Sequence, residues 1–376
     1  MARLGDVCTL RQGFQIPIEN QVQEVRDGYV RFIRIVDYTQ HTDDIRYVKD
    51  CSKFYYVKAD DIVMIRYGAA GEVGFGIEGV IANNLFLIEP NIEINKKYLI
   101  HYLKQPRVKS ELLAASSSTT MPAINFKTVR ELNIPEHTLT EQHDIVCHLD
   151  KIDSLILLRN EQLAKLDELV KSRFIEMFGD PIRNEKGWPI VTLGEVAEIR
   201  IGPFGSLLHK EDYIVGGHAL VNPSHIIDGN ICTDDKLTVS DEKYEELSAY
   251  RLSIGDLVLG RRGEMGRCAV VYEDGLLCGT GSIIIRPKEK MKPYFLQNII
   301  SSPGYKRIIE DKAVGVTMMN LNVPIVSSLT IPLLPIDMQE QYIAFMQQTD
   351  KSKFEIQQSL VKIETLKKAL MQKYFG

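Results

Sequence analysis

Two long segments of the chain carry apolar residues at the spacing of a pairing helix. Between residues 140 and 178 there is no proline or glycine, and apolar residues recur at alternating steps of three and four. The segment 336–376 repeats this pattern. Such heptad spacing predicts two long amphipathic helices, each with an apolar seam. The seam residues that we expect to pair are Ile145, Leu149, Ile152, Ile156, Leu163, Leu166, Val170, Ile356, Leu360, Ile363 and Leu370.

Charged residues interrupt both seams at different places. Arg159 and Arg173 interrupt the first seam, and Lys353 and Lys367 interrupt the second. Because these positions are not equivalent, we expect the two helices to pair with each other as a heterotypic hairpin. A helix of 39 residues is ~58 Å long. The alternative is two separate amphipathic helices, each lying on its own globular region.

The chain is a tandem repeat. Leu4-Gly5-Asp6-Val7 returns as Leu193-Gly194-Glu195-Val196. The motif Asp-Ile/Leu-Val with a following Arg-x-Gly occurs over 61–68 and again over 256–263. Towards the end of each half, and through its long helix, the offset stays at 197 residues, as in Gln142 and Gln339. Each half is therefore a globular region with variable loops followed by the same ungapped helix.

The globular regions show short apolar runs separated by Gly, Asn and Asp turn residues. These runs predict strands at 30–36, 61–66, 80–88, 257–260, 268–271 and 282–285, and helices near 97–104 and 293–300. The predicted fold class is α+β, with mixed helices and strands. We divide the chain into a first globular domain (1–138), a first long helix (139–178), a polar connector (179–188), a second globular domain (189–335) and a second long helix (336–376).

Composition limits the function without choosing one. The 376 residues carry a net charge of −5, and no apolar run approaches the ~18 residues of a membrane span. The amino terminus lacks an apolar signal region, so we expect a soluble, cytoplasmic protein. The six cysteines form no Cys-x-x-Cys pair, and we expect no metal site. A mildly acidic chain would need local basic patches, or help from partners, to bind nucleic acid.

Catalytic motifs are not found. The glycine cluster 68–74 lacks the Gly-Lys-Ser/Thr of a phosphate-binding loop, and a turn between strands is the better interpretation. The acid-x-Lys fragments at 234–236 and 310–312 have no counterpart in the other half, so solvated charge explains them better than a nuclease metal site. No Asn/Asp-Pro-Pro-aromatic stretch of a methyltransferase occurs.

Basic and hydroxyl-bearing loops remain as candidate binding residues. Guanidinium groups suit guanine edges and phosphates, a tyrosine can stack, and hydroxyl groups suit backbone phosphates. Recurrence at equivalent places in both halves supports these loops, although each residue alone is equally well explained as ordinary surface. The candidates are Arg66, Tyr67, Thr119, Thr120, Ser206, Arg261, Arg262, Arg267 and Thr317.

The order of these features resembles the specificity subunit of type I restriction-modification systems. The resemblance covers essentially the whole chain and is carried by the repeated Leu-Gly-Asp/Glu-Val start, the Arg-x-Gly turn, the Leu-x-Ile-Pro exit and the duplicated helix. It implies a non-catalytic subunit with two target recognition domains, each binding one half of a split sequence in double-stranded DNA. It also implies that the long helices form an antiparallel coiled coil that spaces these domains.

The resemblance implies partners and cofactors too. Two methyltransferase subunits would carry S-adenosylmethionine, and two restriction/translocase subunits would use ATP and Mg²⁺, while this chain itself would hold no cofactor and contact no membrane. One departure is that 202–206 (Gly-Pro-Phe-Gly-Ser) has no match in the first half, which has 13–17 (Gly-Phe-Gln-Ile-Pro) there. The two halves are therefore expected to recognise different bases.

Other hypotheses stay open on the sequence alone. The chain could be the DNA-recognition subunit of a related modification system with other catalytic partners. It could also be a coiled-coil scaffold that does not bind DNA, or an enzyme with an unfamiliar site. Salt-sensitive binding of duplex DNA would exclude the scaffold, and turnover by the isolated chain would favour the enzyme.

Overall fold

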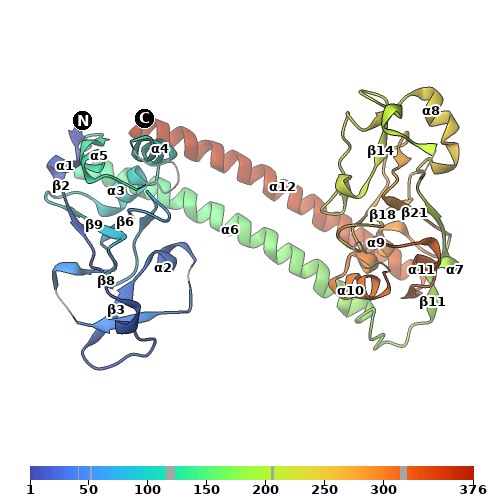
Figure 1. The fold of residues 1–376 in the computed structure, drawn as a ribbon, viewed down its shortest axis with the longest axis horizontal. Helices are drawn as coiled ribbons and strands as arrows, with labels where there is room; N and C mark the ends of the chain where they lie inside the picture. The colour runs from blue at the N-terminus through green and yellow to red at the C-terminus, as the bar shows by residue number, and fades with distance from the viewer. Residues whose placement is uncertain (41, 51–52, 116–122, 205–206, 314–319) are drawn as a thin grey trace. The chain divides into compact units, whose positions relative to one another are not determined.

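The computed structural model describes residues 1–376 except 41, 51–52, 116–122, 205–206 and 314–319. By its internal contacts the chain divides into two compact units. Unit 1 comprises residues 1–161 and 357–376, and unit 2 comprises residues 162–356. Both ends of the chain therefore belong to unit 1 (Figure 1).

Two helices of 40 residues each contribute to both units. They are α6 (Leu139–Phe178) and α12 (Ile336–Phe375). Within unit 1 the two helices are antiparallel, since Asp153 pairs with Lys367 at 2.5 Å and His148 Nδ1 lies 3.0 Å from the Tyr374 hydroxyl. Within unit 2, Asp167 pairs with Lys353 at 2.6 Å. The predicted pairing of the long helices is confirmed, and the alternative of two separate helices is wrong.

The lysines that interrupt the second seam are held by carboxylates of the other helix. Asp167 follows Asp153 by 14 residues, and Lys353 precedes Lys367 by 14 residues, so both ion pairs fit one antiparallel register two heptads apart. Of the predicted seam residues, the structure buries Ile145, Leu149 and Ile152 and half-buries the others. A two-helix seam that solvent borders on both sides has this intermediate exposure.

Unit 1 is built on an antiparallel sheet in the order β2 (Cys8–Gln12), β9 (Leu85–Pro90), β6 (Ile62–Ile65) and β7 (Val73–Gly74). One face packs on α3 (Lys96–Leu103), α4 (Pro106–Ala114) and the helix pair, in a core that includes Ile62, Met64 and Leu149. Because side chains alternate along a strand, Val63 and Ile65 point to the opposite face and enter a second core.

A second sheet of unit 1 covers that opposite face. Its order is β4 (Arg46–Lys49), β3 (Tyr29–Ile33), β8 (Gly79–Ile81) and β5 (Tyr56–Val57). Within unit 1, Figure 1 shows β3 and β8 on the far side of β6 and β9 from α3 and α4. The single strand expected at 80–88 is wrong: a turn with a hydrogen bond from Leu85 N to Ala82 O separates β8 from β9, and the two strands belong to different sheets.

Unit 2 repeats the topology of the first sheet, and three strands of its second sheet correspond to three in unit 1, whereas the fourth strand lies at the opposite edge. Its first sheet has the order β12 (Ala197–Ile201), β21 (Ser282–Pro287), β18 (Leu257–Gly260) and β19 (Cys268–Val270), packed on α9 (Pro293–Ser301) and α10 (Pro303–Lys312). Its second sheet has the order β13 (Tyr213–Ile214), β17 (Thr238–Val239), β14 (His218–Val221) and β20 (Leu277–Cys278). The remaining elements of the two units are β1 (Ala2–Arg3), α1 (Leu4–Val7), α2 (Ile35–Thr39), α5 (Phe126–Glu131), β10 (Asn133–Ile134), β11 (Ile190–Thr192), α7 (Leu193–Val196), β15 (Ile226–Ile227), β16 (Asn230–Ile231), α8 (Asp241–Glu246), α11 (Val323–Ser327) and β22 (Thr330–Pro332). The predicted α+β class with an internal repeat is confirmed.

In each unit a tyrosine hydroxyl binds the short strand that precedes the long helix, but the tyrosine comes from non-equivalent helices in the two units. In unit 1 the Tyr102 hydroxyl of α3 donates to Asn133 O in β10 at 2.9 Å. In unit 2 the Tyr305 hydroxyl of α10 donates to the equivalent acceptor, Thr330 O in β22, at 3.0 Å. The tyrosine and the aliphatic residue occupy opposite positions in the two units: Ile299 is equivalent to Tyr102, and Val108 is equivalent to Tyr305. All four side chains are buried.

A buried glutamine fixes the start of each long helix. Gln142 Oε1 accepts from Asn95 N at 2.9 Å, just before α3, and its Nε2 donates to His137 O at 2.9 Å. Gln339 Oε1 accepts from Lys292 N at 2.8 Å, and its Nε2 donates to Leu334 O at 2.9 Å. Both glutamine side chains are buried, and these hydrogen bonds give their amide groups the partners that buried polar groups require.

We expect Gln339→Leu to destabilise the protein because it leaves the partly buried Lys292 N–H and the buried Leu334 carbonyl without their hydrogen-bond partner. At ~1–3 kcal/mol for each unsatisfied buried group, the free energy of unfolding of unit 2 should fall by about 2–4 kcal/mol. Urea unfolding followed by circular dichroism measures this. Gln341→Leu, at an exposed position of the same helix, is the matched control. Equal stability of the two variants would contradict the role of Gln339.

Candidate nucleic-acid interface

In both units the Arg-x-Gly motif forms a turn between two buried strands. The turn over 66–71 joins β6 to β7, and the turn over 261–266 joins β18 to β19. Gly68 and Gly263 have φ of 93° and 79°, a backbone region that favours glycine. The turn ends in another strand rather than a helix, so the glycines serve a hairpin and not a phosphate-binding loop.

The backbone of each motif arginine is held from two sides in the same way. Arg66 N donates to Asn84 O at 2.8 Å, and Arg66 O accepts from Ile124 N at 2.7 Å. Arg261 N donates to Gly281 O, and its carbonyl accepts from Leu321 N, both at 3.0 Å. Ile124 and Leu321 come shortly after the segments that contain the candidate threonines. The structure therefore brings each motif arginine to the sequence neighbour of a segment that contains a candidate threonine.

Several candidate residues lie outside the described residues. These are Thr119, Thr120, Ser206 and Thr317. Tyr67 is half-buried and Arg262 is exposed, both at the turn.

The guanidinium groups of Arg66 and Arg261 are half-buried without a carboxylate partner in the described part of the chain. The Arg66 guanidinium lies 5.4 Å from the centroid of the Phe126 ring, and its Nε is a buried donor without an acceptor. Arg261 Nε donates to Asn320 Oδ1 at 3.0 Å. Burial, together with the neighbouring charge of Arg262, lowers the pKa of Arg261. Positive charge that no carboxylate neutralises suits a phosphate or a guanine edge.

Arg267 is bound within the protein through both ends of its guanidinium, and its contact with DNA stays a prediction. Its Nη2 lies 2.5 Å from Glu264 Oε2, and its Nη1 donates to Pro223 O at 3.2 Å. Lys306 of α10 binds the same carboxylate at 2.9 Å, and the two cations lower the pKa of Glu264 to about 2. Arg267 thus braces the turn that carries Arg261.

An equivalent brace holds the turn in unit 1. Lys109 of α4, which matches Lys306, forms an ion pair with Glu72. The sequence analysis missed both braces, although the repeated Pro-x-x-Lys start of α4 and α10 is a signal that could have found the lysines. The two glutamates stand at different places in their turns, so the repeat does not identify them.

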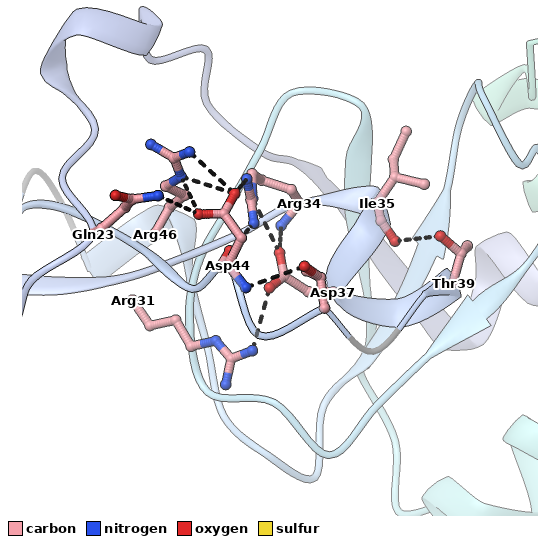
Figure 2. Close-up of polar contacts among 9 residues, drawn as sticks. Gln23, Arg31, Arg34, Ile35, Asp37, Thr39, Asp44 and Arg46 are labelled. Carbon is pink, nitrogen blue, oxygen red and sulfur yellow. Dashed lines mark hydrogen bonds and ion pairs between the residues drawn. The ribbon is translucent and has the colours of Figure 1, made fainter.

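A second basic cluster lies in unit 1, where β3, α2 and β4 meet. Figure 2 shows the Asp44 carboxylate facing the side chains of Gln23, Arg34 and Arg46. Arg34 Nη1 donates to Asp44 at 3.1 Å, and Arg46 Nε lies 2.9 Å from it. These hydrogen bonds, led by the one from Gln23, lower the pKa of Asp44 to about 2.

The Asp37 carboxylate completes this cluster. It is buried, accepts from Arg34 N at 2.7 Å at the start of α2, and lies 3.3 Å from Arg31 Nη2. Because two aspartates neutralise most of the charge of the arginines, the cluster holds the second sheet to α2 rather than offering a free basic patch. Arg34 caps the start of α2, so β3 ends at Ile33, three residues before the end of the strand expected at 30–36.

The fold and the turns define a class of protein. It is a duplicated α+β protein on paired long helices, with an unneutralised arginine at an equivalent turn of each repeat. Among the described residues, no group of three or more His, Cys, Asp or Glu residues could hold a metal ion. None of the described helices is both long and apolar enough to cross a membrane.

The chain belongs to the family described as Type I restriction modification DNA specificity domain, whose sequence model matches residues 1–168 and 185–367. It is a specificity subunit of a type I restriction-modification system, with a role in DNA recognition and not in catalysis.

Two relatives align with this chain over most of their length. The chain is 22% identical to the type I restriction enzyme MjaVIII specificity subunit of Methanocaldococcus jannaschii, over 89% of this chain and 81% of that one. It is 20% identical to the EcoBI specificity subunit of Escherichia coli, over 99% of this chain and 84% of that one.

Solved structures share the fold. The S subunit from M. genitalium has a TM-score of 0.58 at 15% identity, covering 100% of this chain and 95% of that chain. A chain from a structure that describes complex assembly and conformational transition of the type I R-M system has a TM-score of 0.63 at 18% identity, covering 100% and 96%.

We expect Arg261→Ala to weaken duplex binding by the assembled complex by ~1–3 kcal/mol and, where the arginine contacts a base, to relax one target position. Arg262→Ala, at an exposed position of the same turn, should weaken the binding of all sequences alike and flatten the salt dependence, as the loss of a phosphate contact does. Titrations with labelled duplexes at several salt concentrations measure both. Arg183→Ala, an exposed arginine of the connector, is the control. A folded Arg261→Ala variant with unchanged affinity and specificity would exclude this assignment.

Proposed function

We propose that this chain recognises a split DNA target, with one globular domain for each half-site. The domains are 1–138 and 189–335, joined by the connector 179–188 and by the long helices 139–178 and 336–376. The observation that carries the proposal is the repeated setting of Arg66 and Arg261. The same two backbone hydrogen bonds hold each arginine on a braced turn, next to a segment of the sequence that contains a candidate threonine. A recognition element present twice suits a target with two parts.

The two half-sites differ in sequence under this proposal. The turn of unit 1 presents Arg66 and Tyr67, whereas that of unit 2 presents Arg261 and Arg262. Base edges present distinct donor and acceptor patterns in the major groove. Side chains of different chemistry therefore select different bases.

The partners complete the enzyme. Two methyltransferase subunits dock on this chain and carry S-adenosylmethionine, and two restriction/translocase subunits use ATP and Mg²⁺. This chain supplies specificity and binds no cofactor of its own. Its mild acidity is compatible with this division, because the partners supply further positive surface around the DNA.

The test of the function is to express the chain with its methyltransferase subunit and to sequence the methylated sites of the host. The expected result is methylation at one bipartite target. Methylation that is independent of this chain, or none in an assembled complex, would refute the proposal.

Exchanging residues 1–138 for the equivalent region of another specificity subunit should change one half of the target only. The physical reason is that each unit has its own core and its own arginine turn. Sequencing of methylated sites compares the chimera with the parent. If both half-sites change together, the domains do not act separately.

The long helices set the gap between the half-sites. Half-sites on one face of DNA lie ~34 Å apart for each helical turn, and a 40-residue helix is ~60 Å long. Inserting one heptad into each helix, at equivalent positions, keeps the seam in register. Each insertion adds ~10 Å, so the gap should grow by roughly three base pairs while both half-sites stay the same. An unchanged gap in an active complex would show that the helices are not the ruler.

A further inference from the structure

Unit 2 has an open pocket of about 710 Å³ beside the arginine turn. The hairpin β15–β16, the turn that follows β18, and helices α9, α10 and α12 surround it. Two tyrosines line it, Tyr272 and Tyr294, with ring centroids 5.3 Å apart, and the Tyr272 side chain is 49% exposed.

The same place in unit 1 holds the side chain of Lys104. The repeat fixes the equivalence: Gln142 and Gln339 bind the residues just before α3 and α9, and the glycines that end the two turns lie against Lys109 and Lys306. At this offset of 197 residues, Ser301 stands where unit 1 has Lys104.

Unit 1 shows what this place accommodates. The Lys104 ammonium lies 4.6 Å from the centroid of the Phe75 ring, a cation–π contact. Burial lowers the pKa of Lys104, while the nearby carboxylates of Asp153 and Glu72 favour its charged form. An aromatic face and carboxylates together hold an ammonium group that is partly removed from water.

Unit 2 keeps the parts that attract a cation but lacks the cation. Asp350 stands at the place of Asp153, and the tyrosine pair supplies aromatic faces. The nearest ionic partner of Asp350, Lys353, is 3.8 Å away and also binds Asp167 at 2.6 Å. The Asp228 carboxylate, at the tip of β15–β16, has no ionic partner among the described residues.

The other charges that line the pocket compensate one another in part. Arg267 and Lys306 share Glu264. The lining thus contains three carboxylates and two cations, which leaves one net negative charge. A DNA phosphate would meet the Asp228 carboxylate and that of Asp350, whose lysine partner is shared with Asp167, and both repel it.

An apolar groove of about 420 Å³ adjoins the pocket and shares Asn298 and Ser301 with it. Two of its lining side chains, Ile175 and Ile182, are 51% and 46% exposed. An aromatic and acidic pocket beside an exposed apolar groove matches a protein interface, in which a long basic side chain anchors a hydrophobic contact. A free small cation would make no use of the groove.

We propose that this pocket receives a lysine or arginine side chain of the methyltransferase subunit, which takes the place that Lys104 fills in unit 1. The proposal rests on the proposed function, which supplies that partner. Because unit 1 fills its own site, the two methyltransferase copies are held differently, and only the copy bound at unit 2 uses the pocket.

The test is to place an intramolecular cation in the pocket. Ser301→Lys in the full chain should let the new ammonium occupy the site as Lys104 does. We expect the affinity of one methyltransferase copy to fall at least tenfold, so that native mass spectrometry at limiting concentration shows one bound copy instead of two. Asp350→Asn should weaken the same copy and reduce its salt dependence. Ser248→Lys, an exposed serine of unit 2 outside the pocket, is the control for added charge.

The outcomes separate the two levels of inference. Ser301→Lys and Asp350→Asn variants that melt like the parent and bind both copies with unchanged affinity would overturn the pocket assignment and leave the proposed function intact. A parent chain that binds no methyltransferase would refute the proposed function itself. Equal loss of both copies would also count against the assignment, because unit 1 has no vacancy for the partner's cation.

Discussion

The antiparallel register of α6 and α12 is the constraint on which the rest of the molecule depends. The two helices are not attached to finished domains, because each contributes side chains to the cores of both units. Ile145, Leu149 and Phe375 belong to the core of unit 1, and Phe174 and Tyr342 belong to that of unit 2. A shift of the helices past each other would therefore disturb both cores. The ion pairs of Lys353 and Lys367 oppose such a shift, since only one register offers both lysines a carboxylate.

Within each unit, short-range polar contacts connect the long helices to the turn that carries the motif arginine. The buried glutamines connect each long helix to the segment before α3 or α9, and the lysines of α4 and α10 brace the arginine turns. A chain of direct contacts thus runs from helix to turn within each unit. The position of each turn arginine relative to the long helices of its own unit is therefore set by a few polar contacts in a packed surrounding.

The long helices, the duplication and the arginine turns could be predicted from the sequence because each has a local pattern. Heptad spacing and glycines at repeated positions are visible without knowing any long-range contact. The partner of Lys367 could not be predicted, since Asp153 lies more than 200 residues away and becomes its neighbour only in the antiparallel register. The ion pair of Arg267 could not be predicted for the same reason: its nearness to the motif is local, whereas the sharing of Glu264 by Arg267 and Lys306 depends on how α10 packs. The splitting of 80–88 into two strands likewise depends on which sheet each half joins.

The exchange of Tyr102 and Val108 for Ile299 and Tyr305 bears on how such duplicated chains evolve. Each native pair of helices supplies one tyrosine hydroxyl to one carbonyl. A pair made of one helix from each unit would supply two tyrosines or none. Recombination between the halves that separated α3 from α4 would place two tyrosines at a single acceptor, or leave that carbonyl without its tyrosine donor. Gene shuffling can therefore exchange these two helices only as one block. Viable crossover points in this family should lie outside that block, at the long helices, where the repeat carries no gap.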